Sequence, residues 1–86
     1  MTSKNIFKVE DIFSIMGVGI IVVGKLNSGF LKKGMKTTIN GKLSEILKIE
    51  SQNQSVESLT TGIPAGLCLN NISKDDIQKG NEYLFV

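Results

Sequence analysis

Few side chains in this sequence have a type and spacing that could carry out chemistry. Glu10-Asp11 and Asp75-Asp76 are the adjacent acidic pairs, and paired carboxylates can act as general acid and base or bind a hard cation. Neighbouring residues of a strand point to opposite faces, which would separate the first pair. The second pair lies in a turn-like segment, where carboxylates often cap backbone N–H groups. We therefore interpret both pairs as solvated or capping groups, and we expect no catalytic and no metal-binding residues.

A glycine-bounded run ending in lysine, residues 19–25, has the spacing of a phosphate-binding loop. Such a loop needs Ser or Thr after the lysine to coordinate magnesium, and Leu26 stands at that position. The four central residues, 20–23, are large and β-branched, which favours an extended strand over a tight cradle. The sequence therefore predicts no nucleotide site and no cofactor.

The missing residue types narrow the chemistry further. The chain has no His, which removes the commonest general base, most zinc sites and the His-paired nucleophiles. All 10 basic residues are Lys, so no planar guanidinium is present to grip phosphate with two parallel hydrogen bonds. The single cysteine, Cys68, cannot form an internal disulfide, which fits a reducing compartment, and we expect it to be a small buried apolar residue. We expect no enzymatic activity.

The densest basic segment is residues 32–36, which holds three lysines around a glycine. The formal net charge is +2, from 10 basic and 8 acidic residues, so any contact with nucleic acid has to be local. A cluster of lysines in a loop is usually a solvated turn, but it could also contact a phosphate backbone through point charges. The candidate RNA-contacting residues are Lys25, Lys32, Lys33 and Lys36.

Length and composition indicate one globular domain spanning residues 1–86. The chain is 41% hydrophobic and 21% charged, which is ordinary for a folded protein. The longest apolar run, residues 20–23, is far shorter than the ~20 residues that cross a bilayer. The first five residues lack the apolar segment of a signal peptide. We therefore expect a cytoplasmic protein with no membrane association.

Short turn signals punctuate the whole sequence, at residues 16–19, 27–29, 33–34, 40–41, 64–66 and 79–80. The segments between them are rich in Ile, Val, Leu and Phe. Frequent turns between β-branched runs are typical of an all-β domain, either a small closed barrel or a sandwich. Residues 66–69 and 83–86 are expected to be further strands, and residues 75–80 a surface turn.

Two segments allow more detailed expectations. In residues 6–15, Phe7, Val9, Phe13 and Ile15 fall on one face of a strand, with a bend or bulge expected near Asp11. Residues 20–23 are expected to form a strand that is buried on both faces or lies near the centre of the barrel. Residues 40–41 are Asn-Gly, the strongest short hairpin signal, because both tolerate the positive φ of a type I′ turn.

Residues 42–50 fit two patterns. Leu43, Ile46 and Leu47 match a helical stripe, while Leu43, Leu47 and Ile49 share one face of a strand. The hairpin signal before this segment and the polar run after it, residues 51–55, favour a strand that leaves into a loop. We therefore predict a strand.

Taken together, several segments resemble, in register, the second domain of elongation factor Tu. They are residues 7–15, 17–26 and 29–34, followed by 62–69 and 75–80, so the resemblance covers nearly the whole chain. It implies a small six- or seven-stranded antiparallel closed β-barrel. In that family the barrel lies behind a GTPase domain, and the residues that read guanine have no counterpart in these 86 positions. The resemblance therefore also implies no nucleotide binding.

The family barrel also helps to hold the aminoacyl end of transfer RNA, and part of that pocket has matching residues here. The counterparts that keep the family residue or a close substitute are Glu10, Asp11, Phe13, Ile15, Ile21 and Glu50. The polar and cationic part has changed: Val23 replaces a threonine, Asn53 and Val18 stand near or at arginine positions, and Pro64 replaces an asparagine. We expect the fold to be retained and the ligand site to be lost.

Two functions of different class remain. The first is an RNA- or ribosome-contacting module, based on the resemblance and on Lys25, Lys32, Lys33 and Lys36. The second is a protein-interaction or structural module that docks on another protein or on a second copy, using an open strand edge and apolar residues outside the core.

Overall fold

The computed structural model describes residues 4–86, so residues 1–3 of the expected domain lie outside the described residues. Apart from one 3₁₀ helix the regular structure is all β, as predicted. In chain order the elements are β1 (Asn5–Ile15), β2 (Gly19–Ser28), β3 (Leu31–Lys32), β4 (Lys36–Ile39), β5 (Lys42–Ser51), β6 (Gln54–Val56), β7 (Ser58–Leu59), β8 (Pro64–Leu69), the helix η1 (Lys74–Asp76) and β9 (Glu82–Phe85).

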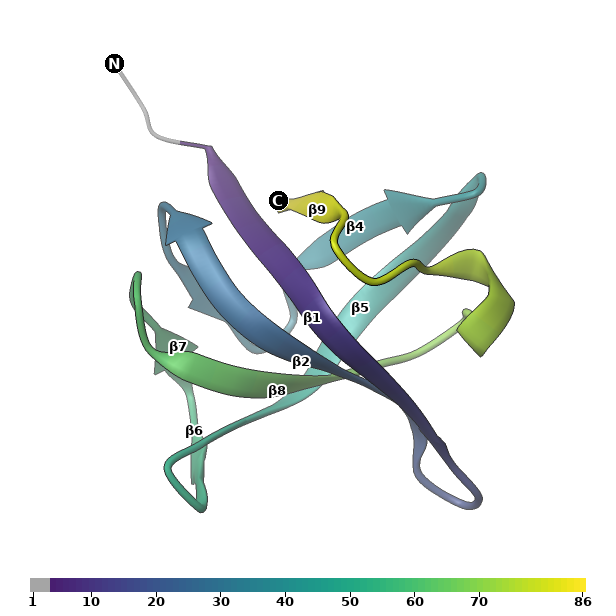
Figure 1. The fold of residues 1–86 in the computed structure, drawn as a ribbon, viewed down its shortest axis with the longest axis horizontal. Coiled ribbons are helices and arrows are strands. Elements are labelled where there is room, and N and C mark those ends of the chain that lie inside the picture. The colour runs from purple at the N-terminus through teal and green to yellow at the C-terminus, as the bar shows by residue number, and fades with distance from the viewer. Residues whose placement is uncertain (1–3) are drawn as a thin grey trace.

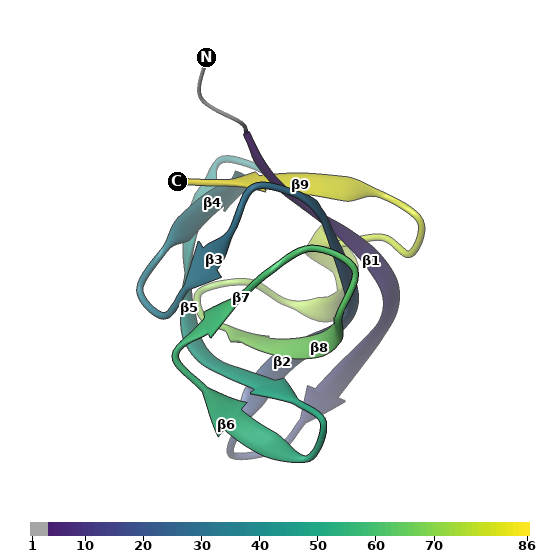
Figure 2. The same cartoon turned by 90° about the vertical axis from the view of Figure 1, so that its left-hand side faces the viewer.

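Six strands form an antiparallel wall in the order β4-β5-β8-β2-β1-β9, with β6 paired to β5 and a short β3–β7 pair beside them (Figures 1 and 2). The two outer strands of this order meet where Lys36 and Val86 exchange N–H···O bonds of 2.8 and 2.7 Å. The wall therefore curls into a nearly closed barrel, which confirms the predicted fold. β1 and β9, from the two ends of the chain, lie side by side.

The inside of the barrel is filled by its own side chains. Burying apolar side chains drives folding at roughly 25 cal/mol per Å², so this interior is the main stabilising feature. Ser44, fully buried among them, satisfies its hydroxyl by donating to the Asn70 carbonyl at 2.6 Å. The largest side chains with almost no exposure are Phe7, Phe85, Leu26, Leu31, Ile46, Ile49, Leu67, Leu69, Val9 and Val22.

A bulge divides β1 into two halves. Val9 pairs with Gly24 and Asp11 pairs with Val23, so Glu10 is an extra residue without a partner on β2. The predicted bulge near Asp11 is confirmed, but the predicted common face is wrong. One inserted residue reverses the alternation, so Ile12 points into the core and Phe13 and Ile15 are each 47% exposed.

A second register shift occurs in β5. The strand prediction for this segment is confirmed, but the shared face of Leu43, Leu47 and Ile49 is wrong. The register with β8 shifts between Ile46 and Lys48, leaving Leu47 as the inserted residue. Ile46 and Ile49 are therefore both buried, whereas Leu43 and Leu47 are exposed.

Most local predictions hold. Asn40 and Gly41 have φ of 51° and 76° and join β4 to β5 as the expected tight turn. Cys68 is buried, and burial raises the pKa of its thiol. Residues 19–25, whose spacing matches that of a phosphate-binding loop, are part of the extended strand β2. Burial on both faces is wrong for residues 20–23, because only alternate residues of this segment are fully buried. The alternative, a central position, is confirmed, because β2 lies between β8 and β1 in the strand order.

The η1 segment is fastened to the β4–β5 hairpin by one carboxylate. Asp76 Oδ2 accepts from Lys42 Nζ at 2.8 Å and from the Ser73 N–H at 2.9 Å, while Asp76 Oδ1 accepts from Asn40 Nδ2 at 3.2 Å. The predicted capping role is therefore confirmed for this residue. Hydrogen bonds from Lys42, then from Ser73 and Asn40, hold the pKa of Asp76 well below its ordinary value of 3.8.

This carboxylate should make stability depend on acidity. Because the folded-state pKa of Asp76 is depressed, its contribution is complete above the unfolded-state value and is lost as the pH falls below it. We expect the urea midpoint of Asp76→Asn to lie below that of the original chain at neutral pH, and the gap to narrow between about pH 5 and pH 2. Asp75→Asn is the matched control. A gap that stayed constant over this range would contradict the assignment.

Candidate functional site

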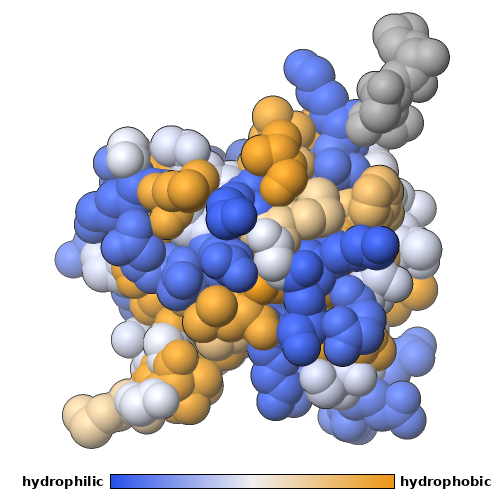
Figure 3. Space-filling view, turned by 180° about the vertical axis from the view of Figure 1, so that it is seen from behind, coloured by the Kyte–Doolittle hydropathy of each residue, from blue (hydrophilic) through white to orange (hydrophobic). Residues whose placement is uncertain are grey.

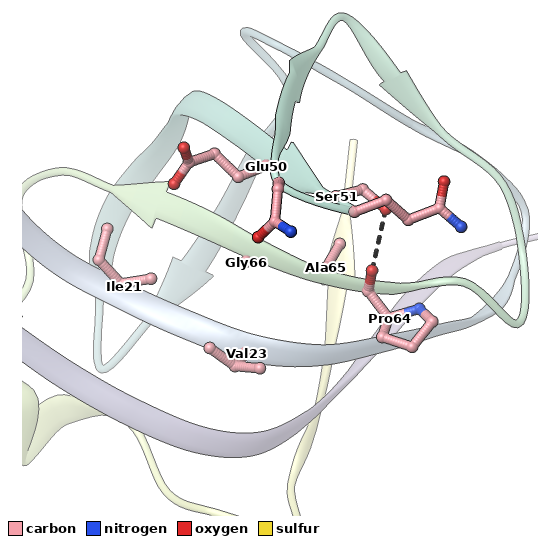
Figure 4. Close-up of a pocket in the computed structure, with 9 residues that line it drawn as sticks. Ile21, Val23, Glu50, Ser51, Pro64, Ala65 and Gly66 are labelled. Carbon is pink, nitrogen blue, oxygen red and sulfur yellow. Dashed lines mark hydrogen bonds between the residues drawn. The ribbon is translucent and has the colours of Figure 1, made fainter.

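A hollow of about 340 Å³ lies on the outer wall of the barrel, over β2 and β8 (Figure 4). The end of β5 and its turn into β6 form one side of it. Its lining residues are Ile21, Val23, Glu50, Ser51, Gln52, Asn53, Pro64, Ala65 and Gly66.

Local sequence explains the shape of this hollow. Gly66 pairs with Val23 on one side and with Glu50 on the other, and its missing side chain leaves the floor low. A Cβ at Gly66 would reach Ile21 Cγ2 at 3.5 Å, an ordinary contact, so the space is open. The rim is fixed because Ser51 Oγ donates to the Pro64 carbonyl at 3.0 Å, which ties the end of β5 to the start of β8.

The β5–β6 turn raises two amide side chains at the rim. Gln52 and Asn53 have φ of 53° and 65°, so both occupy the left-handed region of a two-residue type I′ turn. Asn tolerates this conformation well, whereas Gln adopts it less often. The polar run of residues 51–55 predicts only a loop of unspecified type here.

The hollow lacks a cationic group. Glu50 is the charged residue of its lining, and the Glu50 carboxylate lies 3.6 Å from Lys48 Nζ in an exposed ion pair. An exposed pair of this kind contributes little energy and leaves the rim without an excess of positive charge. The hollow can offer amide and carboxylate hydrogen-bonding groups over an apolar floor, but its lining has no cationic side chain that could bind phosphate.

Only part of the expected family pocket gathers in this hollow. Ile21 and Glu50 lie in it, together with the changed positions Val23, Asn53 and Pro64. The remaining counterparts lie along β1, and Val18 lies in the β1–β2 turn. Of these, Phe13 faces Ile21 across the strand pair, Asp11 faces Val23, Ile15 faces Gly19, and Glu10 is the bulge residue.

Asp11 is occupied by structural contacts. Its Oδ1 accepts from the Ile12 N–H at 2.9 Å and lies 3.2 Å from Lys79 Nζ. The Ile12 hydrogen bond, followed by the one from Lys79, lowers the pKa of Asp11 below its ordinary value. A carboxyl group held in its charged form in this way is a poor proton acceptor at neutral pH.

The four candidate RNA-contacting lysines come from two places. Lys25 lies on β2, opposite Lys8 of β1 and Pro64 of β8. Lys32, Lys33 and the first residue of β4, Lys36, surround the β3–β4 turn, and all are exposed. Among residues 4–86, only Lys33 of the four forms an ion pair, to Glu57 at 3.7 Å.

The β3–β4 turn that carries three of these lysines is held by its backbone. The Lys33 N–H donates to the Glu57 carbonyl at 3.1 Å, and the Gly34 N–H donates to the Ile46 carbonyl at 2.9 Å. Gly34 has φ of 92°, a conformation that glycine adopts without strain. The lysines are thus displayed from an ordered turn.

Sequence reasoning missed Ser51, Gln52, Ala65 and Gly66 as members of the hollow. Nothing local marks them, because β5 and β8 become neighbours only through long-range pairing. In the described part of the chain, no group of three or more His, Cys, Asp or Glu could hold a metal ion. No helix within residues 4–86 is long and apolar enough to span a bilayer.

Comparison with known proteins gives consistent matches. The family model described as elongation factor Tu domain 2 matches residues 19–82. Elongation factor 1-alpha of Methanospirillum hungatei is 33% identical over 75 residues, covering 85% of this chain and 18% of that protein. Elongation factor 1-alpha of Pyrobaculum calidifontis is also 33% identical over 75 residues, covering 85% of this chain and 17% of that protein. The chain thus spans less than a fifth of the length of these relatives.

Two solved structures share the fold. The apo form of translation elongation factor SelB from Methanococcus maripaludis superposes with a TM-score of 0.86 at 20% identity, covering 94% of this chain and 18% of that chain. A bacterial selenocysteine-specific elongation factor superposes with a TM-score of 0.80 at 24% identity, covering 96% of this chain and 14% of that chain.

Proposed function

Because the chain belongs to the family of elongation factor Tu domain 2, we propose that it is a non-catalytic binding module that contacts RNA, including the RNA of the ribosome. It acts in the cytoplasm, where the translation machinery works. It needs no cofactor for this role, since contact with an RNA backbone requires only positive charge and a rigid surface.

The observation that carries this proposal is the ordered β3–β4 turn with its exposed lysines. Lys32 and Lys36 have no ion-pair partner among residues 4–86, so their charges are available to phosphate groups. Lysine contacts phosphate as a point charge, which gives little sequence preference and strong dependence on salt. Binding of this kind is modest in affinity and positions the barrel on RNA without reading bases.

The hollow over β2 and β8 does not carry the RNA contact in this proposal. Its lining has one carboxylate and no cation, so an anionic backbone would be repelled from its rim. Ile21 and Val23 form the apolar floor of the hollow because their side chains lie on the outer face of β2. The lysines and the hollow therefore make separable contributions, and variants can test them independently.

Replacing two lysines should change the salt dependence of binding. For Lys32→Ala combined with Lys36→Ala, we expect the slope of log K against log salt to flatten by about 1.8, since each lost phosphate contact removes about 0.9 on duplex-like RNA. The measurement is fluorescence anisotropy of labelled ribosomal RNA and of unfractionated transfer RNA at several salt concentrations. Lys74→Ala, an exposed lysine of η1, is the matched control and should leave the slope unchanged.

Filling the hollow gives the second arm of this test. Gly66→Leu would place a side chain over Ile21 and Val23, and we expect RNA affinity to stay within twofold of the original chain, a difference below about 0.4 kcal/mol. A large loss with Gly66→Leu and none with the lysine variants would move the RNA contact into the hollow. Absence of salt-dependent binding to either RNA would refute the proposed function.

A protein-interaction module is the second candidate, favoured by a different observation. The outer half of β1 carries exposed Phe13 and Ile15, and among residues 4–86 it pairs with β2 alone. Apolar side chains beside an unpaired strand edge are suited to strand addition by another polypeptide.

A further inference from the structure

An aromatic ring is exposed at the end of the barrel that carries the β3–β4 turn. Phe30, between β2 and β3, is 51% exposed, whereas the following Leu31 is fully buried and Lys32 is exposed again. Side chains alternate along extended backbone, so the Phe30 ring and the Lys32 ammonium leave the chain on the same outer side, about 7 Å apart at the backbone. A base and the phosphate of the same nucleotide are separated by a similar distance, so one nucleotide can contact both.

The backbone on both sides of Phe30 is fixed, so the ring has a defined position. The Phe30 N–H donates to Asn5 Oδ1 at 3.0 Å. Gly29 has φ of 76° and packs so closely on the start of β1 that a Cβ there would overlap Asn5 Oδ1 and the Lys4 carbonyl oxygen. On the other side, Leu31 belongs to the β3–β7 ladder. An aromatic side chain on an anchored backbone loses little freedom when a ligand binds to it.

The same contacts bring two further lysines to this end of the barrel. Asn5 Nδ2 donates to the Phe85 carbonyl at 3.1 Å, and the next residue, Val86, exchanges backbone hydrogen bonds with Lys36. Lys4 precedes Asn5, and its carbonyl accepts a hydrogen bond from the last residue of β2. The start of β1 and the end of β9 therefore lie close to β3 and β4 (Figure 2).

Three lysines and one aromatic ring thus form what we call the Phe30 surface: Phe30, Lys4, Lys32 and Lys36. All four side chains are exposed, and these lysines form no ion pair with any of residues 4–86. Glu57, which precedes the β7 residue paired with Lys32, is engaged by Lys33 at 3.7 Å. The surface therefore combines uncompensated positive charge with an apolar ring. In the upper right part of Figure 3, tan and orange apolar groups stand beside blue hydrophilic ones.

We propose that the Phe30 surface binds unpaired RNA, with a base stacked on the aromatic ring and the neighbouring phosphates against its three lysines. A base in a duplex is covered on both faces by its neighbours, so the ring can stack only on a base that is unpaired or at a strand end. Stacking on an aromatic side chain tolerates any sequence, because every base has a π-face. It adds energy that the point-charge contacts of lysine lack, and it turns a general RNA contact into a preference for single strands.

This inference rests on the proposed RNA contact and specifies its ligand class. The Phe30 surface is separate from the hollow, which is lined by residues of β2, β5, β8 and the β5–β6 turn. Stacking releases no counterions, whereas each contact between a lysine and a phosphate does. The ring should therefore set the affinity for single strands without changing its salt dependence, and the lysines should set both.

The test measures binding of labelled oligouridylate, alone and annealed to oligoadenylate, by fluorescence anisotropy at several salt concentrations. We expect Phe30→Leu to weaken binding of the single strand by about fivefold or more, with the slope of log K against log salt unchanged. Binding of the duplex should be unaffected. Phe30→Tyr keeps an aromatic ring and should keep the affinity for the single strand. Leu43→Ala, which removes a similarly exposed apolar side chain from β5, is the matched control and should change neither.

A second readout reports stacking directly. The chain contains no Trp, so Phe30→Trp introduces its only indole, and a base stacked on that indole quenches its fluorescence. We expect the single strand to quench this fluorescence and the duplex to leave it nearly unchanged. Leu43→Trp is the control for this readout, and its fluorescence should respond to neither form of RNA.

The possible outcomes separate the role of the ring from that of the lysines. An unchanged single-strand affinity in Phe30→Leu, or an equal loss for single strand and duplex, overturns the proposal. So does an indole in Phe30→Trp that the single strand does not quench. If Lys32→Ala combined with Lys36→Ala still flattens the salt dependence in those cases, the proposed RNA contact survives and only the role of the ring is lost. If neither form of RNA binds in a salt-dependent manner, both fail.

Discussion

Gly24→Ala adds only one methyl group, but we expect it to destabilise the barrel strongly, because the backbone leaves no room for that group. Gly24 pairs with Val9 at the β1 bulge, and a Cβ there would overlap the carbonyl oxygen of Lys8, with the Glu10 amide nitrogen also close, at 3.2 Å. The obstacle is backbone, which cannot turn aside as a side chain can. Overpacking usually costs about 1–3 kcal/mol, and we expect at least the upper end of this range.

The matched control for this prediction is Gly66→Ala, which adds the same methyl group to the neighbouring strand. There the Cβ would meet Ile21 Cγ2 at 3.5 Å, an ordinary distance. Alanine also restricts the unfolded chain, so we expect a free energy of unfolding between unchanged and about 1 kcal/mol higher. Equilibrium urea denaturation measures both. Similar stabilities for the two variants would show that β1 does not approach β2 this closely.

Phe85→Ala will remove one of the largest buried side chains from the last strand. Phe85 is 1% exposed and its residue pairs with Asn5 of β1, so the ring helps to fasten β9 to the barrel. Truncating a buried phenylalanine costs about 3–5 kcal/mol through lost burial and the cavity left behind. A small domain has only about 5–15 kcal/mol of stability, so this variant should be largely or wholly unfolded at modest urea concentrations.

Leu84→Ala controls for position in the same strand. Leu84 is 45% exposed, so its truncation should lower the free energy of unfolding by about 0.5 kcal/mol or less. Circular dichroism during urea titration follows both variants. If Phe85→Ala cost no more than Leu84→Ala, then β9 would not close the barrel in solution.

The predictable parts of this fold are those set by residues close in sequence. The Asn40-Gly41 turn was predicted because two residues needing positive φ decide it locally. The strand nature of residues 42–50 followed from that turn. The capping role of Asp76 also followed from its turn context, whereas its contacts with Lys42 and Asn40 depend on a hairpin more than 30 residues away.

Which side chains face the core, and which residues line the hollow, could not be predicted from the sequence, because both depend on the register between strands that are distant in the chain. The sequence predicts a bend or bulge near Asp11 but not the effect of the bulge that forms at Glu10, because one inserted residue exchanges inside and outside for the residues that follow it in the strand. This is why Phe13 was expected in line with the core residue Phe7 and lies outside instead. The hollow shows the same limit: Gly66 and Ser51 come together only through β5–β8 pairing and one hydrogen bond to Pro64.

The pairing of β1 with β9 has a consequence for synthesis of the chain. Asn5 Nδ2 donates to the Phe85 carbonyl across 80 positions, and the paired backbones join the same two ends. While a ribosome is still adding β9, the earlier strands cannot complete this wall, and the apolar lining stays accessible to solvent. Folding should therefore finish only after the last strand has left the exit tunnel, as expected when long-range contacts dominate. If synthesis stopped before β9, the unfinished barrel would expose apolar surface, and we expect such an aggregation-prone intermediate to be bound by chaperones.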